Sequence, residues 1–256
     1  MHNEYATKER ANPVQVVIGA TGGIGAALCR SLAAKGSCLI AAGRDPDKLQ
    51  GLAEELGVIP MAVDATSSEQ MEQCFARIVS EYGRIDGVAN CVGSLLLKPA
   101  HLTSDVEWTS TLTTNLTSAF ITVRAATRAM MKTGGSVVLV SSAVARTGLA
   151  NHEAIAAAKA GIVGLALSAA ASYAIRQIRV NCVAPGLVRT PLTARLTANE
   201  ASLKGSMSMH PLGRIGEPEE VAAAIAWFLD PAQSWVTGQV LGIDGGLATL
   251  RIRGSL

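Results

Sequence analysis

Short apolar segments rich in β-branched residues alternate with longer segments of helical period along almost the whole chain. This alternation is typical of successive β-α-β units, which build a parallel sheet covered by helices on both faces. We therefore expect an α/β protein with one doubly wound parallel sheet of about seven strands in a single domain. The predicted strands are residues 14–19, 38–43, 58–63, 87–90, 136–140, 178–183 and 240–243. The predicted helices are residues 23–35, 46–56, 68–82, 105–132, 152–174 and 218–229.

Two stretches depart from this regular pattern. Residues 105–132 are too long for an average helix, and we expect a break near Thr113 or Thr114. Between residues 187 and 216 the helical period weakens, and such a long irregular segment is usually a lid or binding loop, so we expect the substrate lid there. Apolar residues expected to line the substrate site, or else to serve in the core or at subunit contacts, are Leu192, Leu196, Leu203, Met207 and Met209, with Leu95, Leu96 and Leu97.

The composition adds an expectation about partners. Of the 256 residues, 49% are hydrophobic and only 16% are charged, which excludes a disordered chain and favours a surface partly buried against other copies. Small side chains dominate residues 161–174 and allow close helix contact, so we expect a homotetramer. Lys+Arg (22) and Asp+Glu (20) nearly balance without any block of like charge, so no nucleic-acid partner is expected. The uncharged run of residues 160–175 is shorter than a membrane span and predicts a buried helix.

The cysteines and the N-terminus indicate a compartment. The five cysteines lie far apart and form no CxxC pair or Cys/His cluster, which favours a reducing cytosol and argues against a metal site. The polar N-terminal residues 1–13 lack the apolar stretch of a secretory signal, so a cytoplasmic protein is expected. The cysteines are Cys29, Cys38, Cys74, Cys91 and Cys182.

A glycine-rich loop, Gly19-Ala20-Thr21-Gly22-Gly23-Ile24-Gly25, follows the first predicted strand and leads directly into a helix. Glycines let a backbone turn sharply and approach a phosphate closely, and the N–H groups and dipole of the helix N-terminus attract negative charge. A tight strand-to-helix turn is the ordinary alternative. The position after the first strand favours a dinucleotide-binding loop.

The spacing of this loop, a glycine followed by three residues and then Gly-Ile-Gly, resembles the short-chain dehydrogenase/reductase family. The Thr that usually precedes the first glycine is Ile18 here. The resemblance extends from about residue 14 to residue 246. Further positions that fall in the family's order are Asp64, Asn90-Cys91-Val92-Gly93, Asn115, Ser141-Ser142, Lys159, Asn181, Pro185-Gly186 and Asp244-Gly245-Gly246.

The resemblance implies a Rossmann-type fold, a nicotinamide dinucleotide cofactor, hydride transfer to or from a small carbonyl or alcohol, and a tetramer. It also implies the residues around the cofactor. These are Gly19, Thr21, Gly22, Gly23, Ile24, Gly25, Asp64, Ala65, Asn90, Gly93, Lys159, Pro185, Gly186, Val188 and Thr190, to which we add Arg44.

The end of the second predicted strand bears on the choice of cofactor. A carboxylate there would bind the ribose hydroxyls of NAD and repel the 2′-phosphate of NADP, but the residue is Gly43. The next residue, Arg44, can form charge-assisted hydrogen bonds to that phosphate. An exposed Arg44 paired with Asp45 or Asp47 is the ordinary alternative. We expect NADP(H) to be favoured over NAD(H).

The resemblance places a catalytic Tyr four residues before the Lys and thirteen after the Ser. Counted from either Lys159 or Ser142, this position is Ile155. A phenol beside an ammonium can pass a proton to or from the substrate oxygen, and an aliphatic side chain cannot. No other tyrosine is expected nearby, because Tyr5, Tyr82 and Tyr173 are all remote along the chain.

The other expected site residues remain. Lys159 can hold the ribose hydroxyls, Ser142 can hydrogen-bond a substrate oxygen, and Asn115 can support a water near Lys159. Each also has an ordinary alternative: a solvated lysine, a serine that caps a loop, and an asparagine bonded to a local carbonyl. The joint spacing favours the functional interpretation.

His152 is the one replacement proton carrier that the helix pattern suggests. It lies three residues before Ile155, on the same helical face, after an expected N-cap at Asn151. A histidine that makes only a local hydrogen bond is equally consistent with the pattern. We therefore expect an NADP(H)-dependent oxidoreductase whose proton step uses His152, a water or the substrate. The alternative is an NADP(H)-binding sensor or structural subunit without turnover.

Overall fold

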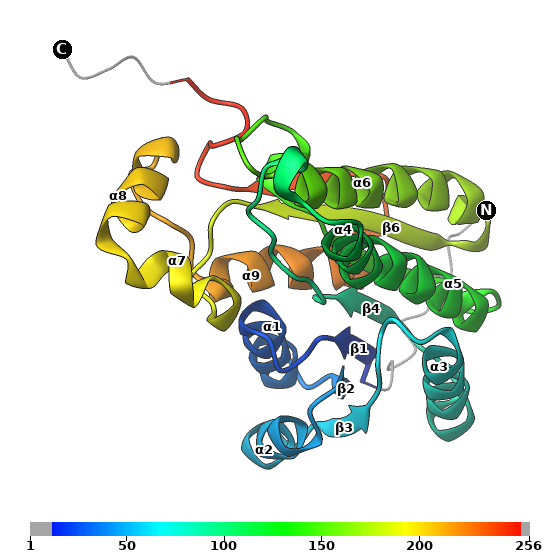
Figure 1. The fold of residues 1–256 in the computed structure, drawn as a ribbon. Coiled ribbons are helices and arrows are strands. Elements are labelled where there is room, and N and C mark those ends of the chain that lie inside the picture. The colour runs from blue at the N-terminus through cyan, green and yellow to red at the C-terminus, as the bar shows by residue number, and fades with distance from the viewer. Residues whose placement is uncertain (1–11, 252–256) are drawn as a thin grey trace.

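The computed structural model describes residues 12–251, which form one seven-stranded parallel sheet in the order β3-β2-β1-β4-β5-β6-β7 (Figure 1). The expected doubly wound α/β fold is confirmed, while Tyr5 and the polar N-terminal segment lie outside the described residues. The strand order reverses between β1 and β4, where ligands of open α/β sheets usually bind. The strands are β1 Val14–Ile18, β2 Cys38–Gly43, β3 Ile59–Ala62, β4 Gly87–Asn90, β5 Gly135–Val140, β6 Ile178–Pro185 and β7 Val240–Ile243.

Helices cover both faces of the sheet (Figure 1). Alternate strand residues supply the two cores: Val16 and Ile18 pack with α3, α5 and α6, and Val17 packs with α1, α2 and α9. Strands buried on both faces need nearly continuous apolar sequence, as predicted. The helices are α1 Gly23–Ala34, α2 Pro46–Leu56, α3 Ser68–Tyr82, α4 Asp105–Leu112, α5 Ser118–Met130, α6 Glu153–Tyr173, α7 Ala194–Ala198, α8 Glu200–Met209 and α9 Pro218–Leu229.

The expected break in the long helical segment is a π-helical turn, Thr113–Thr117, between α4 and α5. The turn contains Asn115, whose side chain is buried and donates a 2.9 Å hydrogen bond to the Thr111 backbone oxygen. π-turns inside α-helices frequently occur at functional sites, because the inserted residue redirects the side chains that follow.

The apolar helix α6 packs in the core, as the uncharged run predicts. Residues 153–176 are long and apolar enough to cross a membrane by length and composition alone. Ile162 and Ala166, however, are buried against the sheet, as in the core helix of a globular protein. The predicted N-cap was wrong: Asn151 has a left-handed backbone (φ 64°) and His152 occupies the capping position without a side-chain capping bond.

The predicted irregular lid segment is largely helical. It contains a short 3-10 turn, Pro191–Thr193, followed by α7 and α8, which lie to one side of the sheet (yellow in Figure 1). Neither α7 nor α8 has a buried residue, so neither needs the apolar period by which a helix is recognised in sequence. The Asn199 side chain starts α8 by accepting a 2.9 Å hydrogen bond from the Ser202 N–H.

Candidate active site

A cavity of about 260 Å³ opens where the carboxyl ends of β4, β5 and β6 meet the glycine loop. It brings together predicted site residues that are far apart in the sequence. Those that line it are Gly22, Gly23, Ile24, Gly93, Ser142, His152, Ile155, Lys159, Pro185, Gly186, Val188 and Thr190. Predicted site residues outside its lining are Gly19, Thr21, Gly25, Arg44, Asp64, Ala65, Asn90 and Asn115.

The glycine loop has the shape of an anion-binding cradle. Gly19 adopts a φ of +78°, and a Cβ on Gly25 would collide with the Gly19 backbone oxygen, so side chains are excluded at both positions. No side chain caps the start of α1 at Gly22, and its first turn holds no acidic residue. The first N–H groups of α1 are therefore available to a negatively charged ligand, as a dinucleotide phosphate requires.

The loop after β6 closes over this cradle. A Cβ on Gly23 would lie 2.7 Å from Thr190 Cγ2, so the first helical turn of α1 packs directly against the start of the lid segment. Val188 forms an isolated parallel bridge with Gly216, which ties the two ends of that segment together. A ligand on the glycine loop would thus lie beside the lid segment.

Arg44 is exposed just after β2, and it follows Gly43, whose Cβ position lies 3.7 Å from the Thr21 hydroxyl of the glycine loop. Asp45 instead pairs with Lys48, at 3.0 Å from Nζ, and within residues 12–251 Arg44 takes part in no ion pair. The expected alternative, in which Arg44 pairs with Asp45 or Asp47, is therefore not observed. The guanidinium is left in solvent beside the cradle.

Asp64 follows β3 and lies near Arg44. Its carboxylate accepts hydrogen bonds from the Thr66 N–H (2.9 Å) and hydroxyl (2.8 Å). These bonds lower the pKa of the Asp64 carboxyl, and the positive charge of Arg44 adds to the effect. A carboxylate held charged in this way can accept hydrogen bonds from a nucleoside.

The loop after β4 is held by two asparagines. Asn90 donates to the Thr122 hydroxyl (3.0 Å) and accepts from the Val92 N–H (2.9 Å). Asn115 binds both the hydroxyl (2.9 Å) and the N–H (3.2 Å) of Ser94, a cavity residue that the sequence analysis missed. The position of Ser94 directly after Gly93 could have identified it as a site residue from the sequence.

Lys159 is buried, so the interpretation as a solvated surface lysine is wrong. Its Nζ donates a 2.9 Å hydrogen bond to the Val140 backbone oxygen, and its own backbone oxygen accepts one of 2.8 Å from the Ser141 hydroxyl. Burial lowers the pKa of Lys159 to about 8, although the thiols of Cys182 and Cys91 act in the opposite direction. The side chain is thus fixed at the carboxyl end of β5.

Ser142 lies beside it with a hydroxyl that is only loosely engaged. Its Oγ makes two 3.4 Å contacts, one as donor to the Pro185 oxygen and one as acceptor from the Val144 N–H. The second contact caps the short turn Ala143–Ala145, as the ordinary interpretation expected. Long hydrogen bonds of this kind are readily exchanged for one to a ligand.

Ile155 presents an aliphatic wall where a tyrosine was expected. It is 3% exposed and lines the cavity one helical turn before Lys159. Within residues 12–251 no tyrosine lines the cavity, since Tyr82 and Tyr173 pack against the core of the α3, α5 and α6 face. Among the residues that the structure describes, no phenol therefore replaces the missing one.

His152 both lines the cavity and makes the local hydrogen bond of its ordinary interpretation. Its Nδ1 lies 2.7 Å from the Ala150 backbone oxygen. Because a carbonyl oxygen only accepts, Nδ1 carries the ring proton and Nε2 is the nitrogen left for a ligand.

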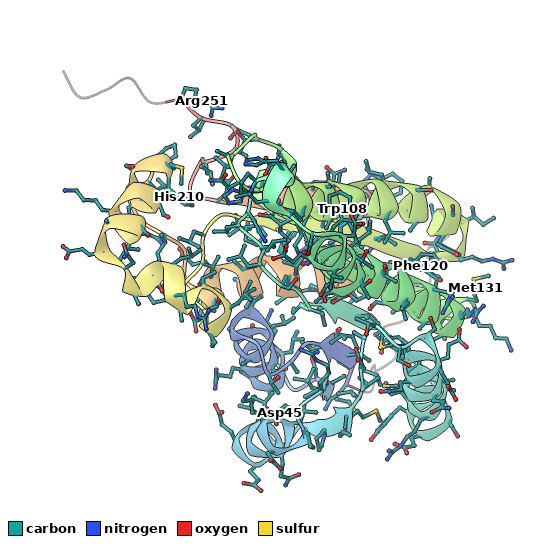
Figure 2. All side chains as sticks on the ribbon, in the orientation of Figure 1. Asp45, Trp108, Phe120, Met131, His210 and Arg251 are labelled. Carbon is teal, nitrogen blue, oxygen red and sulfur yellow. The ribbon has the colours of Figure 1, made fainter. Side chains whose placement is uncertain are left out.

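His210 is a buried residue that no sequence signal identified. It lies at the C-terminal end of α8 (Figure 2). Its Nε2 accepts a 3.2 Å hydrogen bond from the Leu187 N–H, and its Nδ1 lies 2.7 Å from the Ser206 oxygen. A Cβ on Gly186 would lie 2.6 Å from Nε2, so glycine is required there. The imidazole therefore joins the end of α8 to the loop that lines the cavity.

The substrate end of the cavity is apolar, but only part of the expected wall is present. Leu95 and Leu192 line it, whereas the expected Leu196, Leu203, Met207 and Met209, which lie on α7 and α8, do not. Leu96 and Leu97 are also absent from the lining. Residues that complete the wall are Val144, Leu149, Leu187 and Leu247.

Known proteins resemble this chain over nearly its whole length. A family model described as Enoyl-(Acyl carrier protein) reductase matches residues 19–248. The 3-oxoacyl-[acyl-carrier-protein] reductase FabG of Thermotoga maritima is 37% identical over 244 residues, covering 91% of this chain and 97% of that protein. Carbonyl reductase family member 4 of Danio rerio is 36% identical over 242 residues, covering 92% and 98%.

A solved structure agrees with these sequence relatives. The short-chain type dehydrogenase/reductase from Mycobacterium ulcerans superposes with a TM-score of 0.89 and 30% identity, covering 93% of this chain and 90% of that one. Family model, relatives and fold all point to the family that the glycine-loop spacing suggests. The chain belongs to the short-chain dehydrogenase/reductase family of NAD(P)-dependent oxidoreductases.

Proposed function

We propose that this chain is an NADP(H)-dependent oxidoreductase that acts on a small carbonyl or alcohol in a site without the usual tyrosine. The observation that carries the proposal is the single cavity shared by the glycine loop, Ser142 and Lys159. A shared cavity allows a cofactor and a substrate to be bound side by side, which is the first requirement for group transfer between them.

The residues around the cavity fit a dinucleotide. The uncapped first turn of α1 would hold its phosphates, Asp64 its adenine, and Lys159 the hydroxyls of its nicotinamide ribose. When bound, the cofactor would supply a hydride to the substrate or accept one from it. Pro185, Gly186 and Val188 would then border the nicotinamide, since they line the same cavity as the glycine loop and Ser142.

NADP(H) is the favoured form of the cofactor. Gly43 brings no carboxylate to the end of β2, and the nearest side chain to its Cβ position is the Thr21 hydroxyl at 3.7 Å. The exposed Arg44 has its guanidinium available for a 2′-phosphate.

The substrate class follows from the apolar wall and from the relatives. Leucine and valine side chains surround a site that contains the loosely bonded hydroxyl of Ser142, which suits a small molecule with an apolar body and a polar oxygen. The relatives named above are carbonyl and 3-oxoacyl reductases. We infer a carbonyl compound or the corresponding alcohol.

A second candidate function is cofactor binding without turnover, as in a sensor or a structural subunit. Ile155 favours it, because this side chain cannot move a proton. The test is a fluorescence titration with NADPH and NADH, followed by a turnover screen on ketones and alcohols. Turnover supports the oxidoreductase, whereas tight NADPH binding with no turnover on any substrate supports the second function.

We also infer a homotetramer in the cytoplasm. Two separate faces carry exposed large apolar side chains, as two kinds of subunit contact require. One follows α4 and α5, where Trp108, Phe120 and Met131 lie (Figure 2). The other carries Trp227 and Trp235 near the edge strand β7. The five cysteines are free, as is typical of a reducing compartment.

A further inference from the structure

Three titratable side chains line the cavity within the described part of the chain: Cys91, His152 and Lys159. Burial raises the pKa of the Cys91 thiol to about 12, so this group keeps its proton through the ordinary pH range. The Nδ1–H of His152 is engaged by the Ala150 oxygen, so a neutral His152 ring would have no proton on Nε2 to give. Neither group is suited to protonate a carbonyl oxygen.

Lys159 differs from both. Its ammonium has three N–H donors, and the Val140 oxygen is the one acceptor that residues 12–251 supply to it. A Cβ on Gly93 would lie 3.5 Å from Nζ, so the ammonium points toward the loop after β4, which forms part of the cavity lining. Two N–H groups are therefore free on the cavity side.

The surroundings of Lys159 leave its charge without a counter-ion. The titratable groups that face it are the thiols of Cys91, after β4, and Cys182, in β6; β5 contributes a backbone oxygen and the π-turn contributes Asn115. None of the carboxylates in the described part of the chain acts on Lys159. An ammonium buried without a carboxylate releases its proton more easily than an exposed one, which is the property required of a general acid near neutral pH.

We propose, on the basis of the proposed oxidoreductase function, that the Lys159 ammonium itself donates the proton to the substrate oxygen, in place of the missing phenol. One turn earlier on the same helix, Ile155 has no proton to donate, and the residues from 156 to 158 are all alanines. In the reverse direction, the neutral Lys159 amine accepts the proton of the alcohol.

The step balances as an ordinary carbonyl reduction. A bound reduced nicotinamide would supply the hydride to the carbonyl carbon; the C=O π bond would break, and the oxygen would take a proton from Lys159 Nζ. The products are an alcohol, the oxidised nicotinamide and a neutral amine, which regains its proton from solvent. Ser142 would hold the substrate oxygen, and His152 would have no part in the proton transfer.

The first test measures the proton on Lys159 without any turnover. Protein labelled with ¹³C-lysine, free of cofactor, is titrated by NMR, and Lys159→Arg identifies the signal by its loss. The expected result is a midpoint near pH 8. A midpoint at the ordinary lysine value of about 10.4 would overturn the proposal, because such an ammonium is a poor acid near neutral pH.

The second test measures catalysis with NADPH at saturation and ethyl acetoacetate as the ketone. We expect kcat of the natural chain to fall about tenfold per pH unit above the Lys159 midpoint, and Lys159→Ala to lose about 10²-fold or more. Methylammonium should restore part of the Lys159→Ala rate, and ammonium ions of lower pKa should restore more at equal concentration. The exposed Lys132 provides the control: Lys132→Ala should match the natural chain and gain nothing from the amine.

The outcomes separate this proposal from the proposed function. Two results would overturn the role of Lys159 and leave the oxidoreductase function intact. One is a Lys159→Ala variant whose turnover has the same pH profile as that of the natural chain. The other is a Lys159→Ala variant that binds NADPH but gains no activity from added ammonium ions. If the pH dependence of kcat disappears in His152→Ala instead, His152 is the residue that donates the proton. NADPH binding without reduction of any ketone by the natural chain overturns the oxidoreductase and the proton transfer together.

Discussion

The His210 ring accepts a 3.2 Å hydrogen bond from the backbone N–H of Leu187, which joins the C-terminal end of α8 to the loop after β6. The two residues are 23 positions apart, and His210 is 3% exposed. On its other side the ring bonds the Ser206 oxygen in the last turn of α8. One side chain thereby links α8 to the backbone that lines the cavity.

His210→Phe should destabilise the protein by about 1–3 kcal/mol, because the Leu187 N–H would lose its partner in a buried place. Urea unfolding followed by circular dichroism measures this change. His101→Phe is the matched control, since His101 is exposed and should unfold with the natural chain. Equal stability of the two variants would contradict a structural role for the His210 ring.

NADPH should bind at least tenfold more tightly than NADH, a difference of about 1.4 kcal/mol. Arg44→Ala should narrow this difference and leave NADH binding nearly unchanged, because the guanidinium meets only the 2′-phosphate. Fluorescence titration with both cofactors gives the four dissociation constants. Lys48→Ala, which removes a nearby cation already paired with Asp45, should keep the preference. Equal affinities in the natural chain would remove the NADP assignment.

Ile155→Tyr should raise turnover on simple ketones by about 10²-fold or more if proton transfer limits the rate, because it places a phenol one turn from Lys159. Ile155 is buried, so the longer ring also costs about 1–3 kcal/mol of stability. The thermal midpoint is therefore measured beside the rate. A folded variant with NADPH bound and no gain in turnover would argue that the proton step is not limiting.

His152→Ala tests the other candidate proton carrier. From the Nδ1 hydrogen bond to Ala150, we expect less than a threefold change in turnover. NADPH affinity, measured on the same sample, should stay constant. Loss of turnover with binding preserved would assign the proton step to His152.

The lowered pKa of Lys159 also predicts a pH dependence of stability. Between about 8, the folded value, and 10.5, the ordinary one, the unfolded chain holds a proton that the folded chain has lost. Stability should therefore rise with pH in this window relative to Lys159→Met, and the difference should be constant below it. Urea unfolding of both proteins from pH 6.5 to 10.5 measures the difference. A flat difference across the window would contradict the lowered pKa.

Light scattering at micromolar concentration should give four times the mass of one chain. Phe120→Glu and Trp227→Glu each place a charge on one of the two apolar faces, and each should reduce the assembly to dimers, because the other face is intact. The double variant should be monomeric. A natural chain that scatters as a monomer would contradict the tetramer.

Much of the fold could be predicted from local patterns. β-branched runs marked all seven strands, although β6 extends to Pro185, beyond the predicted end. The glycine loop was recognised because the turn before α1 excludes side chains, and only glycine meets this requirement, so it is visible in the sequence. The lid helices were missed because helices without buried residues leave no apolar period.

The sequence by itself determined the α/β fold, the glycine loop and the aliphatic residue at position 155, because each depends on residue type and spacing along one segment. Only the tertiary structure decided that Lys159 is buried with one acceptor among residues 12–251, that Nδ1 of His152 bonds the Ala150 oxygen, and that His210 holds Leu187. The physical reason is that desolvation and hydrogen bonding depend on groups brought from distant segments by the fold. Periodicity indicates which side of a segment is buried, but it does not indicate which groups of other segments contact that side.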